Sequence, residues 1–231
     1  MELESGHLDS RTSVRDIILG MSDGLTVPFA LAAGVSGAVH TTFLVVVAGF
    51  AELAAGAISM GLGGYLAAAS ELDTYRRELA REHHEVVTVP DEERREVRDI
   101  LAGYGLGGET LERAVNALTA SAETWVRFMM REELDLSEPH PSHGWRSGAV
   151  IGLSYAVGGF IPLIPYLFPL PVHTALLISA AFTLAALLVF GAYKGRVTGL
   201  VPWRSALQTM LVGGTAAAVA YGLARLIAHS G

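Results

Sequence analysis

The sequence predicts an all-α polytopic membrane protein with five transmembrane helices and a cytosolic helical metal-binding domain inserted between helices two and three. Three observations lead to this fold class. Of the 231 residues, 51% are hydrophobic and only 17% are charged, which is more apolar than an ordinary soluble domain. Of the 23 acidic residues, 17 lie between Glu71 and Glu138, and none follows Glu138. Five apolar segments are long enough for a membrane-spanning helix, which needs roughly 20 residues.

The segregation of acidic residues divides the chain into three parts. Residues 1–70 hold a short solvated tail and the first two spans, residues 71–145 form the charged domain, and residues 146–231 hold the last three spans. The chain has no cysteine, which excludes a disulfide framework, a thiolate metal site and a cysteine nucleophile. The acidic start MELESGHLDSRTSVRD lacks the basic region of a secretory signal.

The five predicted spans follow one another with few charges inside them. The first contains only Asp23 and the second only Glu52, and the other three contain none. The second is too long for the bilayer alone, and no Gly or Pro interrupts residues 65–89. We therefore expect this helix to continue into the charged domain. The spans are residues 17–39, 41–70, 147–170, 173–193 and 206–224.

Basic residues in the short connections predict the orientation. Lys194, Arg196 and Arg204 lie between spans four and five, whereas the turns near His40 and Pro169 carry no Lys or Arg. Because basic connections stay in the cytosol, the charged domain is expected there as well. All but one of the 16 basic residues are arginine, a bias that favours a GC-rich bacterial genome. Together with the short tails it predicts a bacterial plasma membrane, although a vacuole-like organelle would have the same topology.

Small residues recur four apart in the last three spans, a spacing that allows helices to approach closely. These pairs either pack helices within one chain or form a homodimer interface. They are Gly148 with Gly152, Gly191 with Gly195, and Ala218 with Gly222.

The charged domain is predicted to be a small helical bundle. Pro90 suits the first position of a helix, and Gly103 ends it. Further helices are expected over residues 109–119 and 122–136. Together with the extension of span two, they make a bundle of about 70 residues, which is marginal as an isolated domain.

Acidic residues in this domain are paired at helical spacing. Glu82 and Glu85 are three residues apart, as are Glu93 and Glu96. Residues three apart share a helix face with β-carbons about 5–6 Å apart, so each pair can hold or bridge divalent cations. A solvated helix face is the alternative interpretation.

Methionines accompany these acids. Met129 and Glu133 are four residues apart, and Met130 is adjacent. A thioether beside carboxylates favours Fe²⁺ or another transition ion over Mg²⁺, although two methionines in a small bundle also suit its core. Enzyme motifs are absent: neither His83 nor His84 has Glu three residues before it, and no His-Glu-x-x-His occurs.

The intramembrane carboxylates call for a polar cavity or a partner, because a charge at mid-bilayer costs at least about 2.5 kcal/mol. No Lys or Arg lies within any predicted span to pair with Asp23 or Glu52. A lone carboxylate there takes up a proton, and exchange of that proton for a cation is what ion/proton antiport requires. Gly24 and Pro28 can loosen the helix beside Asp23. Met60 either faces the same cavity or packs as an ordinary apolar residue.

Several segments together resemble the vacuolar iron transporter family, as a bacterial-type member, over nearly the whole chain. They are SDGLTVPFALAAG, GFAELAAGAISMGLGGYLAAASE, REHHEVVTVPDEERREV and FMMREEL, in the order two spans, insert, three spans. The resemblance implies a five-span homodimer that moves Fe²⁺ out of the cytosol in exchange for protons, along a pathway between the two first helices, with a cytosolic domain that collects metal.

The resemblance also implies roles for individual residues. Asp23 and Met60 match the pathway ligands, and Glu52 is proton-linked or structural. The implied partners are protons, the bilayer, a second copy of the chain and divalent ions, namely Fe²⁺, with Mn²⁺, Zn²⁺ or Co²⁺ as further candidates. The resemblance implies no prosthetic group, no catalytic residue and no nucleic-acid partner. The residues that match the metal-binding domain are Glu82, Glu85, Glu93, Glu96, Met129, Met130 and Glu133.

Two other functions remain open. The chain could be a membrane-anchored metal-binding or sensing protein whose spans only dimerise it, in which case Asp23 would be dispensable. It could also oxidise Fe²⁺ at a carboxylate-bridged site, although the usual histidines are missing. We expect transport rather than enzymatic activity.

Overall fold

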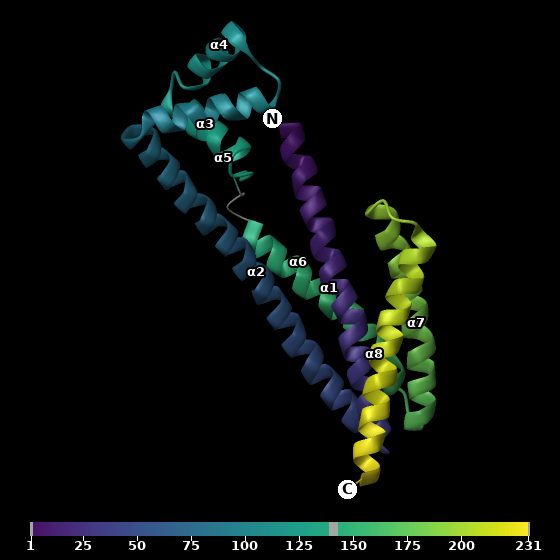
Figure 1. Ribbon diagram of the computed structural model, residues 1–231. Coiled ribbons are helices and arrows are strands. Elements are labelled where there is room, and N and C mark those ends of the chain that lie inside the picture. The colour runs from purple at the N-terminus through teal and green to yellow at the C-terminus, as the bar shows by residue number, and fades with distance from the viewer. Residues whose placement is uncertain (1, 139–142, 231) are drawn as a thin grey trace. The chain divides into compact units, whose positions relative to one another are not determined.

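The structure is a computed structural model that describes residues 2–138 and 143–230, and within them the regular elements are all helices. Five of these helices are long and apolar enough to cross a membrane, which confirms the predicted number of spans. In chain order they are α1 (Glu2–Ala38), α2 (Thr42–Thr88), α3 (Pro90–Gly103), α4 (Gly108–Leu118), α5 (Ala122–Glu132), α6 (His143–Leu163), the 3₁₀ helix η1 (Ile164–Leu167), α7 (Val172–Val197) and α8 (Pro202–Ser230) (Figure 1).

The chain folds into two compact units. The span unit comprises Met1–Leu66 and Gly144–Gly231, and the acidic unit comprises Ala67–His143. The long helix α2 contributes to both, because it runs without a break from Thr42 to Thr88. The expected continuation of this helix into the charged residues that follow span two is therefore confirmed.

Helix α1 begins earlier than predicted. The sequence suggested a solvated tail before residue 17, but the helix starts at Glu2. Residues 2–16 contain Glu, Leu and Arg, which favour helix, and no proline precedes Pro28. Pro28 lies inside α1 and has no N–H to donate to the carbonyl of Gly24, yet the helix continues to Ala38.

Helix α6 packs backbone to backbone against both α1 and α2. On one side, a β-carbon at Gly20 or Gly24 of α1 would overlap a carbonyl oxygen of α6. On the other side, a β-carbon at Gly148 would lie 2.5 Å from the carbonyl oxygen of Gly61 on α2, and one at Gly152 would lie 2.8 Å from that of Ala57. Both contacts of α6 thus require glycine: α1 supplies it at one contact, and α6 itself supplies it at the contact with α2. The pair Gly148 and Gly152 therefore packs helices within the chain.

We expect Gly148→Ala to lower the melting temperature of the purified protein by several degrees. The new methyl group would force α6 and α2 apart, and overpacking of this kind costs typically 1–3 kcal/mol. Gly63→Ala on α2 is the control, because a β-carbon there meets nothing within 4 Å. Equal melting temperatures for the two variants in the same detergent would contradict this packing.

Helices α7 and α8 lie side by side in the same unit, and α8 also packs along α1 (Figure 1). A β-carbon at Gly191 of α7 would lie 2.7 Å from the α-carbon of Ala206, and one at Gly195 would lie 2.8 Å from the β-carbon of Ser205. This second small-residue pair therefore also acts within the chain. Gly222, from the third pair, has nothing within 4 Å of an added β-carbon. The homodimer stays a prediction.

The acidic unit has a core of its own. Helix α3 has the predicted bounds, and α4 begins and ends one residue before its predicted limits. Helix α5 was predicted to reach residue 136 but ends at Glu132. Asp135 adopts a left-handed conformation with φ of 51°, which Asp tolerates better than most residues and which stops a helix. The buried core residues are Val86, Val97, Leu101, Val115, Trp125, Val126, Met129 and Met130.

Candidate functional site

Acidic side chains gather where α2 ends and α3 begins. Val89 alone separates the two helices, so the last turns of one lie next to the first turns of the other. Both predicted carboxylate pairs lie in these turns. A fifth carboxylate comes from the residue that follows α5. We call the set the acidic cluster, and its members are Glu82, Glu85, Glu93, Glu96 and Glu133.

Two members of the acidic cluster are buried. The exposed fractions of Glu82 and Glu93 are 1% and 4%. In each, the Oε2 atom is buried and accepts no hydrogen bond from the described residues. A buried carboxylate oxygen without a donor is costly, because it has lost its water and gained nothing in return. A bound cation or a proton would remove this cost.

Burial, together with repulsion between neighbouring acids, raises the pKa of individual members of the acidic cluster. Burial, and then the charges of Glu96, Glu82, Glu85 and Glu133, raise the pKa of Glu93 to about 7. Burial, followed by Glu96 and Glu82, also raises the pKa of Glu133. Every cause named for Glu93 raises its pKa, so burial and the neighbouring acids act together on this residue.

The raised pKa of Glu93, caused by burial and then by repulsion, predicts that the acidic unit loses stability as the pH rises. Unfolded, Glu93 releases its proton near pH 4.5, but folded it does so near pH 7. The group's contribution is therefore fully present below pH 4.5 and falls as pH rises through 7, by about 3 kcal/mol in all. Glu93→Gln should slow amide hydrogen exchange in α3 at pH 8 and change it little at pH 5.

The control for this prediction is Glu92→Gln, which removes an exposed neighbouring charge that pairs with Arg95 at 3.4 Å. It should leave exchange in α3 nearly unchanged at both pH values. If Glu93→Gln speeds exchange at pH 8, or slows it equally at both pH values, the repulsion inferred for Glu93 is wrong.

The two predicted methionine ligands lie in the core. Met129 is fully buried, Met130 is 2% exposed, and both pack with Trp125 and Val97. As they stand, their thioethers stabilise the acidic unit rather than face solvent. Among the described residues, no group of three His, Asp or Glu side chains is arranged to hold a metal ion. Metal binding by the acidic cluster would thus require these side chains to move.

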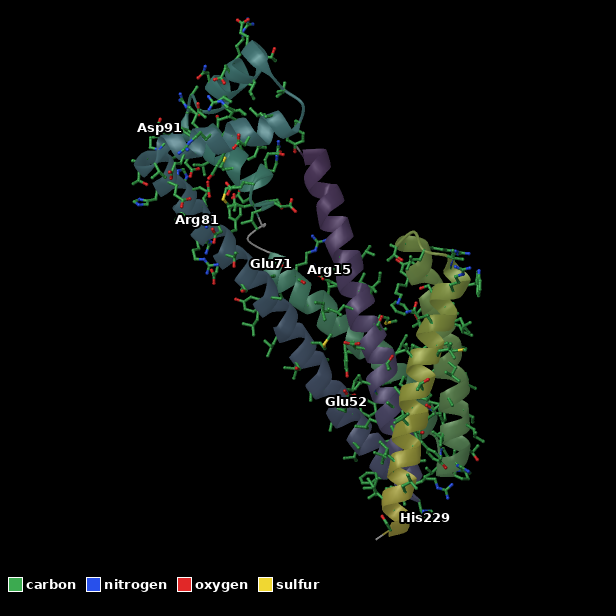
Figure 2. The ribbon with its side chains drawn as sticks, in the orientation of Figure 1. Arg15, Glu52, Glu71, Arg81, Asp91 and His229 are labelled. Atoms are coloured by element: carbon green, nitrogen blue, oxygen red, sulfur yellow. The ribbon has the colours of Figure 1, made fainter. Side chains whose placement is uncertain are left out.

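Within the span unit, Glu52 has a partner that sequence reasoning missed. The Tyr155 hydroxyl on α6 donates a hydrogen bond to Glu52 Oε1 on α2, the residue labelled in Figure 2. Tyr155 is 2% exposed, and Glu52 Oε2 is buried without a hydrogen-bond partner among the described residues. The only sequence signal was that Tyr155 is one of four hydroxyl-bearing side chains in the apolar, Gly-rich span 147–170.

Asp23 belongs to the same neighbourhood. It is half-buried on α1, and its neighbour Gly24 packs directly on the backbone of Tyr155. The Asp23 carboxylate interacts electrostatically with the Tyr155 hydroxyl. Helices α1, α6 and α2 thus contribute Asp23, Tyr155 and Glu52, which we call the intramembrane triad. Met60 of α2 packs partly buried against the core cluster that contains Tyr155.

Asp16 is a second residue that the sequence did not single out. It was expected in a solvated tail, but it is 2% exposed. Its Oδ1 lies 3.5 Å from the Nε of Arg15 and accepts no hydrogen bond from the described residues. The available signal was spacing, since Asp16 precedes Asp23 by seven residues and so shares its helix face.

Comparisons with known proteins find one family, and the matches cover nearly the whole chain. The model of the VIT family matches residues 14–225. "Vacuolar iron transporter 2" of Oryza sativa subsp. japonica is 53% identical over 221 residues, which are 96% of this chain and 90% of that protein. "Vacuolar iron transporter 1" of Arabidopsis thaliana is 50% identical over 96% of this chain and 89% of that protein. "Protein CCC1" of Saccharomyces cerevisiae is 37% identical over 93% and 69%.

These matches cover both units rather than one of them. The matched residues 14–225 include the intramembrane triad and all five members of the acidic cluster. Since the family match spans most of the chain and the relatives are well above 30% identical, the chain is a member of the VIT family.

Proposed function

We propose that this chain carries a divalent metal ion, Fe²⁺ in the first place, across a membrane in exchange for protons. Its relatives include proteins named vacuolar iron transporters, and it has five helices suited to spanning a membrane. The observation that carries the proposal is the intramembrane triad, in which Glu52 has a buried oxygen without a donor.

The intramembrane triad has the chemistry that exchange requires. A carboxylate in a membrane is stable when it binds a proton or a cation and costly when it binds neither. Asp23 would alternate between the two, with the thioether of Met60 as a softer ligand for Fe²⁺. The Tyr155 hydroxyl holds one Glu52 oxygen in place, which leaves the other oxygen for the proton or the metal.

The acidic cluster would collect the ion before transport. Glu82 and Glu93 each present an unpartnered buried oxygen, and a divalent cation would relieve the repulsion that keeps Glu93 protonated. Glu85, Glu96 and Glu133 would complete an oxygen-rich site. Met129 and Met130 could join it only by leaving the core.

Further parts of the proposal concern ions, assembly and location. We propose Mn²⁺, Zn²⁺ and Co²⁺ as additional ions, a homodimer as the assembly, and the cytosol as the side of the acidic unit. The named relatives are eukaryotic proteins, several called vacuolar, so they give no support to the bacterial plasma membrane expected from composition. A transporter family accords with a protein that is not an enzyme.

Uptake of Fe²⁺ into proteoliposomes tests the proposal. Purified protein is reconstituted under anaerobic conditions, a pH gradient is imposed, and metal entry is compared with that into protein-free vesicles and with entry of Mn²⁺. Entry that depends on the protein supports transport. Tight metal binding without entry would instead identify a membrane-anchored sensor, and consumption of oxygen on addition of Fe²⁺ would indicate an oxidase.

A further inference from the structure

We propose that Arg81 competes with the metal ion for the acidic cluster. Its guanidinium contacts two carboxylates of the cluster until a divalent cation displaces it. The inference rests on the proposed capture of metal by the acidic cluster and deepens it. It assigns to this arginine the role of lowering the affinity of capture, so that the ion is held only transiently.

The contacts of Arg81 place its charge among three carboxylates. Its Nη1 lies 3.1 Å from Glu78 Oε2, its Nη2 lies 3.3 Å from Glu82 Oε1, and its Nε lies 3.4 Å from Glu85 Oε2. The planar guanidinium spreads five N–H donors over a rigid fork, whereas an ammonium group is a compact point charge with three donors on one nitrogen. Arg81, labelled on α2 in Figure 2, is thus a single cation shared by three acids of one helix.

Two of these three acids belong to the acidic cluster and the third does not. A metal ion bound through Glu82 and Glu85, even through the Glu82 Oε2 that Arg81 does not contact, would lie close to the guanidinium, and two cations so close repel each other strongly. Glu78 offers Arg81 a place to remain after displacement. The shortest of the three contacts is the one to Glu78, so the arginine can release the acidic cluster and stay paired.

Arg81 is far more exposed than the buried acid that it contacts. Its side chain is 48% exposed, whereas that of Glu82 is 1% exposed. The guanidinium can therefore swing toward water without disturbing the core, and its departure would uncover a buried carboxylate. This arrangement suits exchange of one cation for another.

The arginines of α3 are engaged elsewhere. Arg94 stacks over the ring of Trp125 at 5.9 Å, Arg95 pairs with Glu92, and Arg98 makes two hydrogen bonds to Glu112. Arg81 also acts electrostatically on Glu133. The positive charge on the acidic cluster therefore comes chiefly from Arg81.

The inference is tested by titrating full-length protein in detergent with Mn²⁺ and measuring the binding affinity by isothermal titration calorimetry. Arg81→Gln should bind Mn²⁺ about tenfold more tightly than wild type, because two carboxylates no longer have to exchange partners. Arg77→Gln removes the same charge one turn earlier on α2, where Arg77 pairs with Glu78 at 3.5 Å and with no other acid of the described residues. It should stay within twofold of wild type.

A second variant keeps the test decisive if the first one unfolds. Arg81→Lys retains the positive charge but concentrates it on one nitrogen, which fits three separate carboxylates less well, so it should bind Mn²⁺ two- to fourfold more tightly than wild type. Equal or weaker binding by folded Arg81→Gln or Arg81→Lys overturns the inference. Absence of Mn²⁺ binding in wild type and variants alike is a different result, which rejects the proposed metal capture itself and this inference with it.

Discussion

Asp23→Ala abolishes metal uptake driven by a pH gradient, with an expected loss of at least about a hundredfold, while the acidic cluster still binds metal. The reason is that exchange needs a group that binds either a proton or a cation, and alanine binds neither. A factor of one hundred corresponds to about 2.7 kcal/mol, which is modest for the loss of a carboxylate ligand in a membrane.

Two measurements on the same protein check this result. Uptake of Fe²⁺ and Mn²⁺ is measured in proteoliposomes, and Mn²⁺ binding is measured in detergent. Ser22→Ala is the control, because Ser22 precedes Asp23 on α1 and is half-buried like it. Wild-type uptake by Asp23→Ala would refute the proposed role of Asp23, and loss of Mn²⁺ binding would show that the substitution acts beyond the span unit.

The second large effect is expected from the double variant Glu82→Gln with Glu85→Gln. We expect the apparent affinity for metal to fall on the order of a hundredfold, since two charged ligands are lost at once. The maximal rate of uptake at saturating metal should change little. A change in apparent affinity with an unchanged maximal rate is the signature of lost capture rather than lost translocation.

A matched control separates ligand loss from loss of net charge. Glu109 and Glu123 are exposed and pair with Arg113 and Arg127, one helical turn away in each case. The double variant Glu109→Gln with Glu123→Gln removes two charges from the same acidic unit and should keep its metal affinity within about twofold, because exposed pairs contribute little. Equal losses of metal affinity in both double variants would show that the acidic cluster attracts metal only through its net negative charge and not through specific ligands.

Much of the fold could be predicted because its signals are local. The length of each apolar run determines whether it can span a bilayer, and Pro90 and Gly103 mark the ends of α3. The end of α5 was missed because Asp135 takes a left-handed conformation that its residue type permits but does not require. The helical start of α1 was missed because acidic residues suggested solvation, although they also favour helix.

The candidate site was predictable only in part, because its decisive features arise in the folded chain. Carboxylate pairs are visible from spacing, but the burial of Glu93 depends on the packing of α3 in the acidic unit. The partner of Glu52 is Tyr155, which lies 103 residues away. The two methionines fitted both a ligand set and a core, and only the structure places them in the core.

Proton movement coupled to metal entry is the most direct test of the proposed exchange. Proteoliposomes containing the wild-type protein and a trapped pH indicator receive Mn²⁺ outside, with no initial pH gradient. Exchange predicts that protons leave as metal enters, so the interior becomes more alkaline. It also predicts that metal enters more slowly when the interior is made more alkaline than the outside beforehand. Metal entry without a pH change, at a rate that no pH gradient alters, would contradict proton exchange.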